Sequence, residues 1–85
     1  MYVHYMTVGK DLEITRSVMK NGRLNVYIEQ PADTENGFKH LICELPTYRV
    51  IEENNVSKED MEFWLELVKT NAHLIIREAT LEGVS

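Results

Sequence analysis

The last third of the chain, from Ser57 to about residue 80, has the sequence pattern of one long amphipathic helix. Ser57 and Asp60 have the spacing of a capping serine and the third residue of the helix that it caps. One apolar stripe follows the segment at about 100° per residue. It consists of Met61, Trp64, Leu65, Val68, Ala72, Ile75 and Ala79. We therefore predict a helix over residues 58–80 that packs through this stripe on the preceding residues.

A second apolar line runs along the same predicted helix, about 140–160° around the axis from the first. It consists of Phe63, Leu67, Leu74 and Leu81. Together the two lines span about 220°, whereas a surface helix usually shows an apolar stripe of roughly 100° or more. One sheet cannot cover so wide an arc. We therefore expect either the N-terminal segment or a second copy of the chain on the second line.

The first half of the chain predicts a β-hairpin, because residues 11–19 and 23–30 alternate between apolar and polar side chains around Asn21-Gly22. A three-residue loop over Lys20–Gly22 places Ile14 opposite Ile28, and Val18 opposite Leu24. This register keeps the apolar side chains on one face, which a shift by one residue would not do. We therefore predict a type I turn with a bulge at Gly22.

A second hairpin is predicted over residues 38–45 and 48–53, with Pro46-Thr47 at its turn. Its first strand is apolar on both faces, which is typical of a central strand. The expected register places Leu45 opposite Tyr48. It also pairs His40 with Glu53, Ile42 with Ile51 and Glu44 with Arg49 on the face away from Leu41, Cys43 and Val50.

The expected architecture is a single α+β domain over residues 1–85. A four-stranded antiparallel meander carries one C-terminal amphipathic helix packed on one face. The sheet gains a fifth strand if residues 2–8 form an edge strand, and otherwise these residues form a loosely held arm. The sequence leaves open which face of the sheet the helix covers.

Charge and composition restrict the surroundings in which the protein acts. The net charge is −5. Residues 44–85 hold nine acidic and four basic side chains, so the acidic excess lies there. An acidic surface repels phosphate, which argues against nucleic-acid binding through the helix. No apolar run approaches the roughly 20 residues that cross a membrane, and we expect neither a membrane span nor a signal peptide. With Cys43 as its single cysteine, the chain forms no internal disulfide, and we expect a cytoplasmic location.

The side chains best suited to metal binding or catalysis are His4, His40, His73 and Cys43. His40 and Cys43 lie three residues apart on one predicted strand, so they point to opposite faces. The sequence has no Cys-x-x-Cys or His-x-x-x-His spacing. We expect no metal and no cofactor, and we place Cys43 in the core.

The first functional hypothesis is a small cytosolic protein-interaction module without catalysis, which forms a homodimer or binds a protein partner. Its predicted interface consists of Phe63, Leu67, Leu74, Tyr27, Ile42 and Ile51. An alternative is an antitoxin-like, nucleic-acid-linked regulator that uses Arg16, Lys20 and Arg23. A second alternative is a small enzyme with His40 and Glu53 as an acid/base pair. Whether the protein binds a small molecule is not determined by the sequence.

Overall fold

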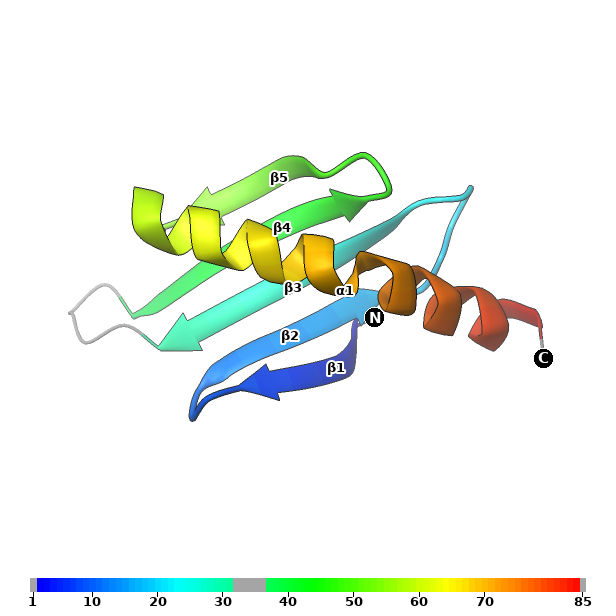
Figure 1. Ribbon diagram of the computed structural model, residues 1–85, viewed down its shortest axis with the longest axis horizontal. Coiled ribbons are helices and arrows are strands. Elements are labelled where there is room, and N and C mark those ends of the chain that lie inside the picture. The colour runs from blue at the N-terminus through cyan, green and yellow to red at the C-terminus, as the bar shows by residue number, and fades with distance from the viewer. Residues whose placement is uncertain (1, 32–36, 85) are drawn as a thin grey trace.

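The computed structural model describes residues 2–31 and 37–84, which form one antiparallel sheet and one helix (Figure 1). The sheet is a five-stranded meander in the order β1-β2-β3-β4-β5. Residues 2–8 form its first edge strand, so the five-stranded alternative is the one observed. The strands are β1 (Tyr2–Val8), β2 (Leu12–Ser17), β3 (Leu24–Pro31), β4 (Phe38–Leu45) and β5 (Arg49–Asn54).

The helix α1 (Lys58–Val84) crosses one face of the sheet diagonally, from the β4–β5 side toward the β1–β2 side (Figure 1). Its cap is the predicted one, because the backbone N–H of Asp60 donates a hydrogen bond of 3.1 Å to Ser57 Oγ. It extends to residue 84, beyond the predicted end at residue 80. No helix within residues 2–31 and 37–84 is long and apolar enough to cross a membrane.

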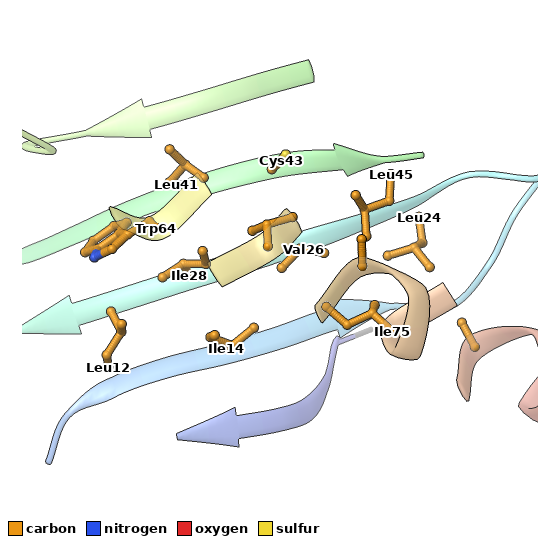
Figure 2. Close-up of a cluster of buried hydrophobic side chains, with 13 residues drawn as sticks. Leu12, Ile14, Leu24, Val26, Ile28, Leu41, Cys43, Leu45, Trp64 and Ile75 are labelled. Carbon is orange, nitrogen blue, oxygen red and sulfur yellow. The ribbon is translucent and has the colours of Figure 1, made fainter. Parts of the chain in front are cut away.

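The hydrophobic core lies between α1 and one face of the sheet (Figure 2). Alternate residues of the strands point toward the helix, as the period of two in a strand requires. The stripe predicted to face the sheet does so, since Trp64, Val68 and Ile75 are each 1% exposed. The other buried apolar residues are Leu12, Ile14, Leu24, Val26, Ile28, Leu41, Cys43, Leu45, Ala72 and Ala79.

The hairpin of β2 and β3 has the predicted Ile14–Ile28 pair, but its turn and the predicted Val18–Leu24 pair differ from the prediction. Ile14 lies opposite Ile28, as predicted. At the turn, Asn21 and Gly22 both have positive φ, and Lys20 and Arg23 exchange two backbone hydrogen bonds of 2.8 and 3.0 Å. This is a two-residue type I′ turn, which Asn-Gly favours. The predicted three-residue turn is wrong.

The extra residue of this hairpin is accommodated in the strand instead of the turn. Between the Arg16–Val26 pair and the Lys20–Arg23 pair, residues 17–19 stand against residues 24–25. Three residues of one strand thus face two of the other, which is a β-bulge. Val18 is consequently exposed and not paired with Leu24. Arg16 lies on the core face because it continues the alternation of Leu12 and Ile14 in β2.

The hairpin of β4 and β5 also contains a bulge, and it changes the predicted pairs. Glu44 lies opposite Arg49, as predicted, but the register shifts after Cys43 and Val50. Beyond the shift Ile42 lies opposite Glu52, and His40 opposite Asn54. The predicted pairs of His40 with Glu53 and of Ile42 with Ile51 are therefore wrong.

Candidate functional site

The second apolar line of α1 remains on the surface, and we call its residues Phe63, Leu67, Leu74 and Leu81 the outer stripe. Phe63, Leu74 and Leu81 are 53, 52 and 62% exposed, while Leu67 packs against the edge of the core. The N-terminal segment does not cover the stripe, because it pairs with β2 as the edge strand of the sheet. The predicted alternative of an N-terminal arm over this stripe is therefore wrong.

Charged side chains are sorted along the exposed surface of α1. Glu59, Glu62 and Glu66 occupy its first half. Lys69, His73 and Arg77 follow further along the helix, and all six residues are exposed. The part of the outer stripe from Phe63 to Leu74 therefore has acidic side chains at its N-terminal end and basic ones at its C-terminal end. Beyond it, Glu78 and Glu82 are also exposed and pair with Arg16.

A second surface is the open face of the sheet, by which we mean the face turned away from α1. Tyr27 lies near its centre. Its ring centroid is 5.5 Å from that of Tyr2 and 5.7 Å from that of His40, and it stacks on His40 at an interplanar angle of 20°. Ile42 lies opposite Tyr27 in the β3–β4 register. A row of rings thus crosses from β1 over β3 to β4.

Carboxylates accompany this row of rings. The Tyr27 hydroxyl donates a hydrogen bond of 2.7 Å to Glu29 Oε2. His40 Nε2 lies 2.7 Å from Glu52 Oε2, and His4 Nε2 lies 3.1 Å from Glu13 Oε2. Burial first, then the bond to Glu29 and the negative charges of Glu29 and Glu52, raise the pKa of Tyr27 from 10.0 to about 12. The carboxylates of Glu13, Glu29 and Glu52 therefore make this part of the open face acidic.

A hollow of about 340 Å³ opens on this face over β1, β2 and β3. It is lined by Tyr2, Glu13, Thr15, Tyr27 and Glu29. Glu13 and Glu29 lie directly opposite each other on neighbouring strands. Tyr2, Glu13 and Glu29 were not among the residues predicted to form a site. Their alternation with core residues was visible in the sequence, but it gave no indication of which side chains share a hollow.

The six residues predicted to form one interface fall on separate surfaces. Phe63, Leu67 and Leu74 belong to the outer stripe, whereas Tyr27 and Ile42 lie on the open face of the sheet. Ile51 is exposed at the bulge of the edge strand β5. Because the sheet and the helix layer separate the outer stripe from the open face, no single flat interface includes all six.

The basic cluster predicted for nucleic-acid binding does not form as expected. Arg16 is 1% exposed and bonds to Glu78 and Glu82 of α1. Burial lowers the pKa of Arg16, but the hydrogen bonds to Glu82 and Glu78 outweigh it and leave the pKa raised. Lys20 and Arg23 remain exposed at the hairpin tip. Because only two of the three predicted basic side chains are exposed, nucleic-acid binding by this cluster is less expected than the sequence suggested.

The predicted acid/base pair is also not formed. The bulge in β5 brings Glu52, and not Glu53, to His40. Cys43 is fully buried, and burial, followed by the charge of Glu44, raises the pKa of its thiol. Within the described ranges, no three His, Cys, Asp or Glu side chains are grouped so that they could hold a metal ion.

The chain was compared with protein-family models, with curated proteins and with solved structures, and no match was found in any of the three.

Proposed function

We propose that the protein is a small protein-interaction module without a catalytic site, and that it forms a homodimer through the outer stripe of α1. The observation that carries this proposal is the exposure of Phe63, Leu74 and Leu81 along one line of a helix whose opposite side is already packed on the sheet. Contiguous apolar surface of this kind marks interaction sites in soluble proteins.

The spacing of the outer stripe favours another helix as the partner. Leu67, Leu74 and Leu81 lie seven residues apart, and Phe63 precedes Leu67 by four residues. With Thr70 and Arg77 between the leucines, the line alternates in steps of four and three, which is the heptad spacing of helix pairs. From Phe63 to Leu81 this line follows α1 for about five turns.

The distribution of charge favours an antiparallel pair of α1 helices. An antiparallel arrangement brings the segment with Glu59, Glu62 and Glu66 of one copy to the segment with Lys69, His73 and Arg77 of the other. A parallel pair would place like charges together. An antiparallel pair also satisfies the two-fold symmetry of most homodimers, in which the same patch is used by both copies. It places Phe63 of one copy near Leu74 of the other.

The proposal is tested by the oligomeric state in analytical ultracentrifugation. We expect a dimer whose fraction rises with concentration in the micromolar range. Leu74→Glu should weaken dimerisation at least about tenfold, because the dimer would bury the exposed Leu74 side chain, and full burial of a leucine is worth roughly 1.5–3 kcal/mol. The matched control is Ile51→Glu, which places the same charge on another exposed apolar position and should leave the dimer intact. A wild-type chain that stays monomeric at several hundred micromolar contradicts the proposal.

The orientation of the two helices is tested by cross-linking. A Phe63→Cys chain and a Leu74→Cys chain are mixed and oxidised under mild conditions, where the buried Cys43 is protected. The antiparallel arrangement predicts a disulfide between the two different chains. Efficient cross-linking of Leu74→Cys with itself would instead indicate a parallel pair.

A further inference from the structure

The hollow on the open face of the sheet combines two features that suit one kind of ligand. Its walls include the rings of Tyr2 and Tyr27, whose centroids are 5.5 Å apart and whose planes are tilted by 48°. Its lining also includes Glu13 on β2 and Glu29 on β3, which lie opposite each other. The faces of aromatic rings attract cations, and carboxylates bind them by charge and hydrogen bonding.

Glu13 and Glu29 form a like-charged cross-strand pair, which destabilises a sheet in the absence of a neutralising group. Side chains directly opposite each other on neighbouring strands have Cβ atoms about 5 Å apart. Among the described residues, no lysine or arginine forms a salt bridge with either carboxylate. His4 contacts Glu13 but forms no salt bridge with Glu29. The pair is therefore placed to gain from a cation supplied by another molecule.

Both carboxylates retain the capacity to accept further hydrogen bonds. Glu29 accepts its bond from the Tyr27 hydroxyl through Oε2. Glu13 accepts from Thr7 Oγ1 at 3.1 and 3.2 Å, next to its contact with His4. A carboxylate offers about four acceptor positions, so donors entering the hollow would find acceptors on both sides.

We propose that this hollow binds the guanidinium group of an arginine from a second protein. A guanidinium is planar, stacks on tyrosine rings and directs several N–H donors outward in one plane, so that it can reach carboxylates on two neighbouring strands. The ammonium group of lysine lacks the flat face. The open face of a second copy is a poor occupant, because two acidic open faces would repel each other. The hollow lies on the face of the sheet turned away from α1, so the site stands apart from the proposed dimer through the outer stripe.

The test is a titration of ¹⁵N-labelled protein with blocked arginine, N-acetyl-arginine amide, followed by NMR. Binding should shift the amide signals of Thr15, Tyr27 and Glu29, with a Kd on the order of millimolar for a single side chain. The matched lysine compound should bind more weakly, and the uncharged citrulline compound should not shift these signals. The proposal is overturned if citrulline and arginine shift them equally, or if arginine at about 50 mM shifts none of them.

Variants locate the binding in the hollow. Glu13→Gln and Glu29→Gln should each weaken arginine binding about fivefold, and Tyr2→Leu about threefold. Glu53→Gln is the matched control, because it removes an exposed carboxylate that lies outside the hollow, and it should leave binding unchanged. The fluorescence of the buried Trp64 reports whether each variant is folded. Equal losses in the control and in the hollow variants would show non-specific attraction to the acidic chain and overturn the proposal.

Discussion

Arg16 of β2 and Glu78 of α1, 62 residues apart in the chain, are joined by a hydrogen bond of 2.9 Å from Arg16 Nε to Glu78 Oε1. Arg16 Nη2 also lies 2.6 Å from Glu82 Oε2, one helical turn further along α1. The arginine side chain is 1% exposed, whereas those of Glu78 and Glu82 are 47 and 45% exposed. The buried guanidinium of Arg16 thus attaches the C-terminal half of α1 to the sheet through the partly exposed carboxylates of Glu78 and Glu82.

The two carboxylates should act as alternative partners of Arg16, so that their removal is strongly non-additive. Glu78→Gln or Glu82→Gln alone should cost less than about 1 kcal/mol of unfolding free energy, because the other carboxylate still neutralises the arginine. The double variant leaves a buried guanidinium without a counterion and should cost about 3 kcal/mol. Urea unfolding, followed by the fluorescence of Trp64, measures both quantities.

The control for this prediction is Glu53→Gln, which removes an exposed carboxylate of β5 that takes no part in the contact with Arg16. Its unfolding free energy should change by no more than about 0.5 kcal/mol. Additive and small losses at Glu78 and Glu82 would show that Arg16 is stabilised by packing of its aliphatic part and not by the two carboxylates.

Tyr27 should ionise at an unusually high pH in the folded protein. Its pKa is raised to about 12 by burial and by the carboxylates of Glu29 and Glu52. The folded state favours the neutral phenol. The contribution of Tyr27 to the free energy of unfolding is therefore fully present below pH 10 and is lost as the pH rises through 12. Tyrosinate absorbance at 295 nm should contain a transition near pH 12 that Tyr27→Phe removes. The same transition persisting in that variant would contradict this assignment.

The thiol of Cys43 should be inaccessible in the native protein. Its side chain is fully buried, and both burial and the neighbouring charge of Glu44 raise its pKa, which disfavours the reactive thiolate. A thiol reagent such as DTNB should therefore react with Cys43 only as fast as the core opens, and urea should accelerate the reaction strongly. A fast reaction in native buffer would place the thiol outside the core.

The cap at Ser57 should contribute measurably to the stability of the fold. Ser57→Ala removes the acceptor for the N–H of Asp60 and should lower the unfolding free energy by about 1 kcal/mol. Ser57→Asp supplies another capping acceptor and should retain most of that stability. Thermal unfolding followed by circular dichroism compares the two variants. If both lose the same stability, the hydroxyl does not act as a cap.

Local patterns in the sequence are sufficient to predict the helix, most of the strands and many of the core residues. The Ser57–Asp60 cap depends on neighbouring residues alone, and the stripe from Trp64 to Ile75 follows from the pitch of a helix. The register of Ile14 with Ile28 follows from alternation, because only one register keeps the apolar side chains together. These interactions have a fixed period or a short separation, so the sequence by itself determines them.

Only the tertiary structure decides the strand pairs near the two bulges and the residues of the sheet that α1 contacts. One extra residue in residues 17–19 and one in β5 change the pairs, and alternation alone does not locate them. The first bulge leaves Val18 exposed, and the second gives His40 the partner Glu52 in place of Glu53. Arg16 is buried in the core region because α1 crosses β2 with Glu78 and Glu82 in reach. That proximity arises only when residues more than 60 positions apart pack together, which no local pattern encodes.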